Sequence, residues 1–326
     1  MKHPVKTGAG ILLVVAVVML PGVITTVLGF SSLSVVGAMA ALPAVVATIM
    51  MNTRFALTMA AGTAISMSLM VFVAHDPIAA GICFAAISFA AGMTAVRGVA
   101  FIAVMIPIET AFIFVAPPEV FPNQVGNAGF VFVVALISGV WAALAGGVIA
   151  RRVPKHTFEP VHRDRAIAYA TMIAVLTGIT AWAVARYNWG HSGAWVLLTV
   201  LVVLQPYLQD AFKKTLYRSF GTVLGFVAAY IFGLIIPIPA LLYVVGTACL
   251  AAAMIAMVDR KLPYWLYVSF LTPAIVLLEG ANTSVTATAI DRLLATLIGT
   301  GAALAAIALV IPLYRRTART HHLDHF

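Results

Sequence analysis

The chain has 326 residues, of which 63% are hydrophobic and 9% are charged, whereas soluble domains carry about 25% charged residues. This composition excludes a soluble globular protein and indicates an integral membrane protein. Lys and Arg number 19 against 10 for Asp and Glu, and we attribute the excess to membrane topology and anionic lipid rather than to nucleic acid binding.

Apolar stretches of about 20 residues recur along the chain, the length that a helix needs to cross the hydrocarbon core of a bilayer. They are continuous rather than alternating, so they predict helices and not barrel strands. We predict an all-α polytopic membrane protein with about 12 transmembrane helices. The range 193–206 is short and also fits a half-helix. In chain order, the predicted spans are 9–30, 33–51, 54–74, 77–96, 98–116, 127–149, 166–187, 193–206, 216–236, 240–258, 263–279 and 289–312.

The distribution of positive charge orients these spans. With a cytoplasmic N-terminus, only Arg186 and Arg292 of the 19 Lys and Arg residues fall outside. Because cytoplasmic loops carry an excess of Lys and Arg, the pattern favours a multi-pass protein with both termini in the cytoplasm. If one helix had been missed, the loops after it would fall on the wrong side of the membrane and the bias would be lost. The charge distribution therefore also supports the number of spans.

The sequence also suggests an internal repeat, a common origin of membrane transporters. Landmarks recur 163 residues apart, in the same order relative to the spans. They are Pro43 with Pro206, Gly62 with Gly225, and Arg97 with Arg260. Six helices per half is an even number, so two parallel six-helix repeats are expected. The predicted parts are a first repeat at 1–150, a basic cytoplasmic linker at 151–165, a second repeat at 166–314 and a cytoplasmic tail at 315–326.

Prolines interrupt several of the predicted helices. In each half, a helix that runs towards the cytoplasm is stopped or kinked by a proline, Pro43 in the first half and the pair Gln205 and Pro206 in the second. Pro107 and Pro273 lie inside further spans. Proline lacks the N–H group that a helix interior requires, so we expect local breaks at these positions.

Small residues open the helix that follows Pro206. Gly221, Thr222 and Gly225 lie near its start, and small residues allow helix backbones to approach closely in lipid. We expect these three residues to form a packing seam between the halves. The alternative is that they serve only local packing.

Glu109 is the clearest ionisable residue inside a predicted span. It lies about twelve residues, or roughly 18 Å, from the cytoplasmic end of its helix, and two residues after Pro107. A charge at this depth is costly, and desolvation favours the neutral carboxyl group. Glu109 is therefore our candidate for proton coupling. The alternatives are a structural carboxyl group bonded to backbone that Pro107 frees, or a simple substrate contact.

Other charged residues are candidates for an anion pathway. On the cytoplasmic side, four arginines would form a positive funnel for organic anions, or act only as determinants of topology: Arg54, Arg97, Arg218 and Arg260. On the outer side, Arg292 would bind an exiting carboxylate or pair with Glu279. The alternative is that Asp291 stabilises a helix N-terminus while Arg292 extends towards the interface. Trp195 belongs either to an interfacial aromatic belt or to a stacking site for an aromatic substrate.

The sequence contains no P-loop, no HExxH motif and no cluster of carboxylates typical of a membrane transferase. Its only cysteines, Cys83 and Cys249, lie singly in apolar spans. We therefore expect no enzyme activity, no metal site and no cofactor.

Two stretches of the second half, HSGAWVLLTVLVVLQPYLQDAFKKTLYRSFGTVLG and DRLLATLIGTGAALA, resemble the fusaric-acid-resistance-like superfamily, which contains bacterial aromatic acid exporters. The residues that carry the resemblance are Trp195, Thr199, Gln205, Pro206, Arg218, Gly221, Thr222, Gly225, Asp291, Arg292, Thr296 and Gly299. The first half retains only Pro43, Arg54 and Gly62. Its resemblance therefore depends on the repeat.

The resemblance implies a secondary exporter of small, often aromatic, organic acids in the bacterial inner membrane, driven by protons and often accompanied by a periplasmic membrane-fusion protein. A plant branch of the superfamily forms dimeric malate channels, so an organic-anion channel acting as a homo-oligomer is the nearest alternative. A non-transporting membrane subunit of an efflux assembly is another. The chain resembles the compact branch without a large cytoplasmic domain between the halves, so the substrate does not carry over from the larger exporters.

Overall fold

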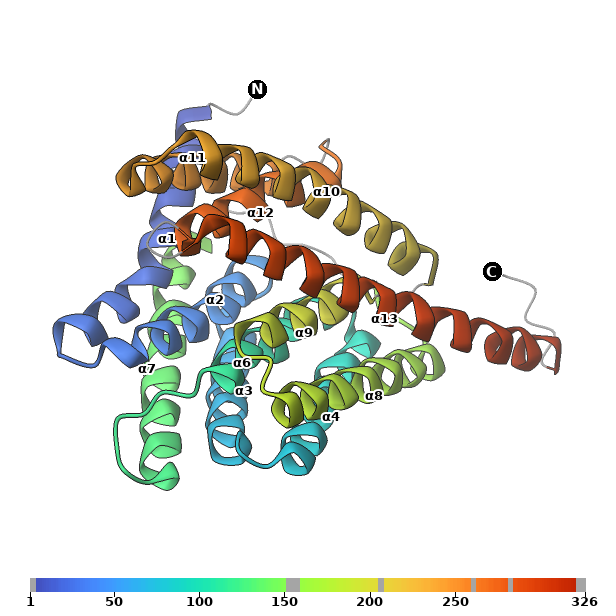
Figure 1. Ribbon diagram of the computed structural model, residues 1–326. Coiled ribbons are helices and arrows are strands. Elements are labelled where there is room, and N and C mark those ends of the chain that lie inside the picture. Colours follow the sequence, from blue (N-terminus) through green and yellow to red (C-terminus); the bar gives the residue numbers. More distant parts are fainter. Residues whose placement is uncertain (1–3, 151–158, 205–207, 259–261, 281–283, 321–326) are drawn as a thin grey trace. The chain divides into compact units, whose positions relative to one another are not determined.

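A computed structural model describes residues 4–150, 159–204, 208–258, 262–280 and 284–320. These residues form helices and contain no strand (Figure 1). The chain divides into two compact units, Met1–Ala194 and Trp195–Phe326, called unit 1 and unit 2 below.

Unit 1 contains the helices up to α8 and the start of α9. They are α1 (Pro4–Val27), η1 (Ser31–Leu33), α2 (Ser34–Met50), α3 (Thr53–Val73), α4 (Pro77–Met93), η2 (Thr94–Arg97), α5 (Ala100–Ala103), α6 (Met105–Val115), α7 (Gln124–Ala150), α8 (Arg163–Tyr187) and α9 (His191–Val203). Unit 2 contains the rest of α9, followed by α10 (Leu208–Ile235), α11 (Pro239–Val258), α12 (Tyr264–Gly280) and α13 (Val285–Thr320).

Apolar helices occupy the predicted spans. Within the described residues, 7 are long and apolar enough to cross a membrane: Ser31–Met50, Thr53–Val73, Pro77–Arg97, Gln124–Ala150, Arg163–Tyr187, Phe212–Ile235 and Val285–Ala308. Shorter apolar helices lie at Leu13–Val27, Ala100–Val115, His191–Val203, Pro239–Ala253 and Tyr264–Leu278. The structure confirms the all-α polytopic class. The exact number of spans and the two repeats stay predictions.

Small residues determine how closely the helices of unit 1 pack. A Cβ atom added to Gly139 of α7 would lie 2.6 Å from the Cβ atom of Ala60 on α3. On the neighbouring pair, a Cβ atom added to Gly81 of α4 would lie 2.9 Å from the carbonyl oxygen of Gly178 on α8. Lipid supplies no hydrophobic force between helices, so close backbone approach provides much of their attraction. The pairing also places α8, which begins the predicted second repeat, against α4 of unit 1.

The prolines differ in their effect on the helices. Pro107 explains why α5 ends at Ala103 and α6 starts at Met105. It lies four residues after Ala103, so it would have to donate a backbone hydrogen bond to the Ala103 carbonyl oxygen in a continuous helix. Proline has no N–H group to donate, and its ring clashes with that carbonyl group. By contrast, α2 continues past Pro43 to Met50, so this proline does not stop its helix. Pro273 is likewise retained inside α12. Gln205 and Pro206 lie outside the described residues.

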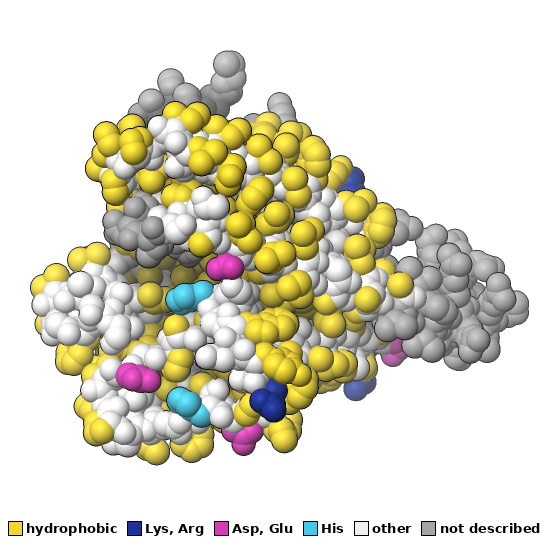
Figure 2. Space-filling view, viewed as in Figure 1, with side chains coloured by type: hydrophobic (Ala, Val, Ile, Leu, Met, Phe, Trp, Pro, Cys, Tyr) yellow, Lys and Arg dark blue, Asp and Glu magenta, His cyan; other side chains and the backbone are white. Residues whose placement is uncertain are grey.

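The surface of unit 2 suits a lipid environment. Hydrophobic side chains cover most of the visible face over α10 and α11 (Figure 2). The exposed large hydrophobic residues of α10 are Phe212, Leu216, Phe220, Val223, Leu224, Val227, Tyr230, Ile231, Leu234 and Ile235. Such a continuous apolar surface would be unusual in water.

Candidate functional site

Two arginines are buried in unit 2. Arg218 of α10 is 6% exposed and Arg292 of α13 is 7% exposed. Charged side chains are almost never buried to this extent without partners, and a charge at membrane depth is costly. Both positions are therefore candidates for a functional role.

Arg218 is incompletely satisfied. Its Nη1 atom donates to the hydroxyl oxygen of Tyr264 at 3.5 Å, and its Nη2 atom donates to the hydroxyl oxygen of Thr199 at 3.4 Å. Its Nε atom has no hydrogen-bond partner among the described residues. A guanidinium group carries five N–H donors, so two long contacts to neutral oxygens leave capacity for an anion.

Glycines bring Arg218 to Tyr264. Arg218, Gly221 and Gly225 follow at spacings of three and four residues, so they share one face of α10. A Cβ atom added to Gly221 would lie 2.5 Å from the carbonyl oxygen of Trp265 on α12, and one added to Gly225 would lie 2.7 Å from the Cβ atom of Thr272. Thr222 is also buried. Gly221 and Gly225 therefore pack against α12 within the second half.

Arg292 stacks on Trp195. Its guanidinium carbon lies 3.3 Å from the centroid of the Trp195 ring, well inside the range of a cation–π contact. One turn along α9, the hydroxyl group of Thr199 donates to the Trp195 carbonyl oxygen at 2.8 Å, and its oxygen accepts from Arg218. A Cβ atom added to Gly299 of α13 would lie 2.7 Å from the Cβ atom of Thr199. Helix α9 thus contacts Arg292 through Trp195 and, one turn later, Arg218 through Thr199.

Two tyrosines of α12 complete this arrangement. The rings of Tyr264 and Tyr267 lie 5.8 Å apart at an angle of 37°, and the Lys214 Nζ atom lies 5.5 Å from the Tyr264 ring. Tyr267 interacts electrostatically with both Arg218 and Arg292. We call the following residues the cation–aromatic cluster: Trp195, Thr199, Arg218, Tyr264, Tyr267 and Arg292.

The structure describes the side chains of three other predicted anion-pathway residues. Arg54 and Arg97 are exposed in unit 1, and Asp291 is exposed on α13. Glu279 belongs to α12, but its side chain lies outside the described part of the structure. Arg260 also lies outside the described residues. Of the predicted pathway residues whose side chains the structure describes, Arg218, Arg292 and Trp195 meet in one cluster.

Sequence reasoning missed Tyr264 and Tyr267. Their spacing of three residues places them on one helix face. However, Tyr264 lies three residues after Lys261 and Tyr267 lies six residues after it, in a position where tyrosine is expected as an interfacial anchor. The contact with Arg218 could not be inferred from that position.

Glu109 lies in unit 1 and is 4% exposed. On its helix, Ile106 meets Gly62 of α3, with 3.1 Å between the Ile106 Cδ1 atom and a Cβ atom added to the glycine. Farther along the same pair of helices, Ile113 and Met67 share one hydrophobic core cluster. Glu109 therefore lies along the contact between α6 and α3.

Helices α3 and α6 carry two further buried polar groups. The hydroxyl groups of Thr63 and Thr110 are buried and have no hydrogen-bond partner among the described residues. The described residues also provide no hydrogen bond or ion pair to the Glu109 carboxyl group. Three buried polar side chains thus have unused hydrogen-bonding capacity in a region that is otherwise apolar.

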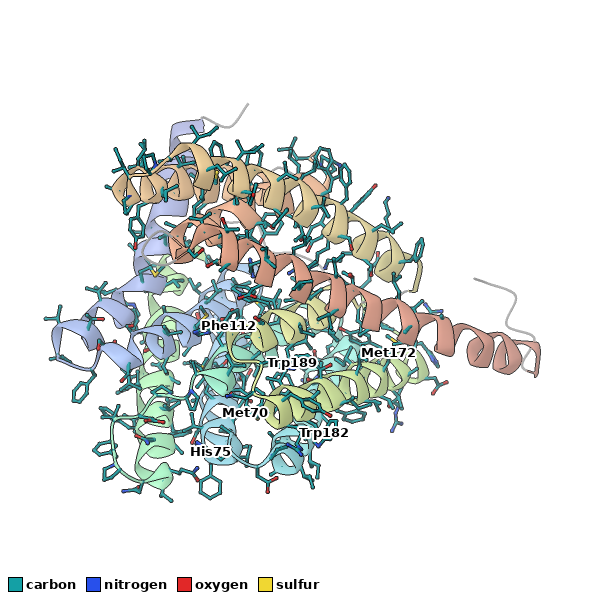
Figure 3. All side chains as sticks on the ribbon, in the orientation of Figure 1. Met70, His75, Phe112, Met172, Trp182 and Trp189 are labelled. Carbon is teal, nitrogen blue, oxygen red and sulfur yellow. The ribbon has the colours of Figure 1, made fainter. Side chains whose placement is uncertain are left out.

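Aromatic residues gather at the C-terminal end of α8, where Figure 3 labels Trp182 and Trp189. The rings of Trp182 and Tyr187 meet edge to face with centroids 6.2 Å apart, and the Arg186 guanidinium carbon lies 5.9 Å from the Tyr187 ring centroid. Trp182 is 39% exposed and Trp189 is 37% exposed. This exposure fits the aromatic belt expected at a membrane interface.

The cation–aromatic cluster has the chemistry of a binding site for anions. Guanidinium groups bind carboxylates with two parallel hydrogen bonds, and the neighbouring hydroxyl groups can donate further bonds. Among the described residues, no group of three His, Cys, Asp or Glu side chains could hold a metal ion.

Comparison with known families gives a match to part of the chain. Residues 176–306 match the family described as fusaric acid resistance protein-like. The matched range runs from α8 into α13 and includes the whole cation–aromatic cluster. No curated protein and no solved structure matches the chain.

Proposed function

We propose that this chain, whose residues 176–306 match the fusaric acid resistance protein-like family, exports small organic acids, chiefly aromatic ones, across a membrane. The family suggests a membrane transporter, and the apolar helices fit a multi-pass protein. The chemistry of the cation–aromatic cluster supports aromatic acids as the class of substrate.

Arg218 carries this proposal. It is 6% exposed and holds two neutral oxygens at 3.4 and 3.5 Å, while its Nε atom has no described partner. A carboxylate would satisfy these donors with charge-assisted hydrogen bonds, which are roughly twice as strong as neutral ones. The ligand best suited to this position is therefore an organic anion.

The aromatic preference rests on Tyr264, whose hydroxyl group contacts Arg218, and on Tyr267, whose ring lies 5.8 Å from that of Tyr264. Aromatic pairs favour tilted or offset contacts with centroids about 4.5–7 Å apart, so an arene attached to the carboxylate would find suitable partners there. Trp195 is less suited to stack on a substrate, since Arg292 covers one face of its ring at 3.3 Å.

Proton coupling is assigned to Glu109. A buried carboxyl group can hold a proton when neutral, and its ionised form is disfavoured in an apolar region. Proton uptake and release at Glu109 would couple export of the anion to the proton gradient.

The proposed setting is the bacterial inner membrane, with both termini in the cytoplasm. Substrate would enter past the cytoplasmic arginines and leave on the side of Glu279, Asp291 and Arg292. A periplasmic membrane-fusion protein is the proposed partner, and a homo-oligomer is the proposed assembly. These assignments follow from the charge distribution and from the family resemblance.

Transport in proteoliposomes tests the function. Vesicles containing the full-length protein would be loaded with aromatic carboxylates, and efflux would be followed with and without an imposed proton gradient. Empty liposomes correct for diffusion of the neutral acids. We expect protein-dependent efflux that the proton gradient accelerates. Electrical conductance that follows the anion gradient without protons would indicate a channel instead, and absence of flux for every anion would overturn the proposal.

A further inference from the structure

Asn127 is a buried polar residue in the apolar helix α7, where it is 8% exposed. Its Oδ1 atom accepts from the backbone N–H groups of Val120 and Phe121 at 2.8 and 2.7 Å. Its Nδ2 atom donates to the Phe121 carbonyl oxygen at 3.0 Å. Because a buried amide is costly unless it is hydrogen-bonded, these contacts account for its presence. They hold the loop between α6 and α7 beside the first turns of α7 (Figure 1).

The loop brings Phe121 into an aromatic group. The ring centroid of Phe130 on α7 lies 5.6 Å from that of Phe121 and 5.1 Å from that of Phe30, which follows the end of α1. Phe121 is 43% exposed and Phe30 is 36% exposed, and large hydrophobic neighbours are exposed as well. We call these residues the aromatic patch: Val27, Leu28, Phe30, Phe121 and Val125.

The exposed apolar face of α7 indicates what covers this patch. Large hydrophobic side chains are exposed along one face of the helix, at Val125, Val133, Ile137, Trp141, Leu144 and Val148. At 1.5 Å per residue this face extends over about 35 Å, slightly more than the hydrocarbon core of a bilayer, which is about 30 Å thick. Val125 therefore lies at one boundary of that core. The loop that precedes it lies at the level of the lipid headgroups.

The backbone of the loop is suited to that depth. An irregular segment near hydrocarbon is costly when its N–H and C=O groups lack partners. Asn127 satisfies the N–H groups of Val120 and Phe121 and the carbonyl group of Phe121. Three further residues of the loop have no N–H group to satisfy, namely Pro117, Pro118 and Pro122.

We propose that residues 117–123 form a membrane anchor, which places Phe121 and Phe30 at the boundary between phospholipid headgroups and acyl chains. Aromatic side chains favour this depth, and Asn127 is the positioning residue that holds the loop there. The surface thus fits a lipid interface. The inference rests on the multi-pass membrane class and goes beyond the proposed export of organic acids.

Spin-label accessibility tests the anchor. The full-length chain with Cys83→Ala and Cys249→Ala would carry a nitroxide at Phe121→Cys in vesicles of phosphatidylcholine and phosphatidylglycerol. Oxygen concentrates among the acyl chains, whereas a nickel chelate stays in water. We expect the label at position 121 to lose collisions with the chelate and gain collisions with oxygen, relative to a label at Glu119→Cys, which replaces an exposed residue of the same loop. Equal access of the chelate to both labels would place the loop in water and overturn the proposal.

Asn127→Leu tests the positioning role. Leucine has a similar volume but removes all three hydrogen bonds, so the label at position 121 should become mobile and lose its preference for oxygen. The matched variant is Gln124→Leu, which removes an exposed amide from the first turn of α7 and should leave the label unchanged. Unchanged depth and mobility in Asn127→Leu would overturn the role of Asn127. The comparison of positions 121 and 119 leaves Asn127 intact and needs no transport, so failure of the export proposal would not affect it.

Discussion

Arg292 and Trp195 form the closest cation–aromatic contact in the described part of the chain, with 3.3 Å between the guanidinium carbon and the ring centroid. The contact joins α13 to α9 across 97 residues of sequence. The contact holds the side chain of Arg292, which is 7% exposed, against α9.

Trp195→Leu should destabilise the protein. Loss of a desolvated cation–π contact costs about 2 kcal/mol, and the midpoint of thermal unfolding in detergent should fall accordingly. Trp189→Leu provides the control, because this tryptophan is 37% exposed. Equal decreases in unfolding temperature for the two variants would show that the contact between Arg292 and Trp195 makes no specific contribution to stability.

Arg218→Lys should weaken substrate binding although it preserves the charge. Lysine lacks the planar set of donors that grips a carboxylate and both hydroxyl groups, so we expect apparent KM for efflux to rise by about tenfold. Arg54→Lys is the matched change at an exposed arginine and should leave KM within about twofold. Identical kinetics for Arg218→Lys and the wild type would remove Arg218 from the binding site.

Glu109→Gln should uncouple transport from protons. Glutamine fills the same space but cannot release a proton, so efflux should lose its response to an imposed proton gradient while any downhill flux persists. The control is Glu119→Gln, which alters an exposed glutamate outside the helices. Full proton dependence in Glu109→Gln would disprove coupling through this residue.

Gly221→Ala should disturb the contact between α10 and α12. The added methyl group would lie 2.5 Å from the Trp265 carbonyl oxygen, and overpacking costs about 1–3 kcal/mol. Because Arg218 shares this helix face, transport should fall as well. Gly301→Ala offers a comparison inside α13, where nothing lies within 4 Å of the added atom and alanine favours the helix. Thermal unfolding of both variants measures the difference, and tolerance of Gly221→Ala would contradict the close packing.

Local sequence was sufficient to predict much of the molecule. Apolar runs predicted the all-α membrane class and the positions of its helices, because hydropathy and helix length are properties of single segments. Charge inside such a run identified Glu109, and the family-like stretch of the second half identified Arg218, Arg292 and Trp195. The repeat stays a prediction, although Pro77 and Pro239, 162 residues apart, begin α4 and α11 in the same order.

The tertiary structure decided which helices meet. Gly221 and Gly225 were expected to pack against the other half but contact α12, and Tyr264 and Tyr267 joined the buried arginines although their position suggested interfacial anchors. Helices in lipid associate through shape and a few polar contacts, and many small-residue faces in one chain are alike in sequence. A single segment therefore determines that it becomes a membrane helix, whereas its partner, and the site that the two build, depend on the three-dimensional fit among all the helices.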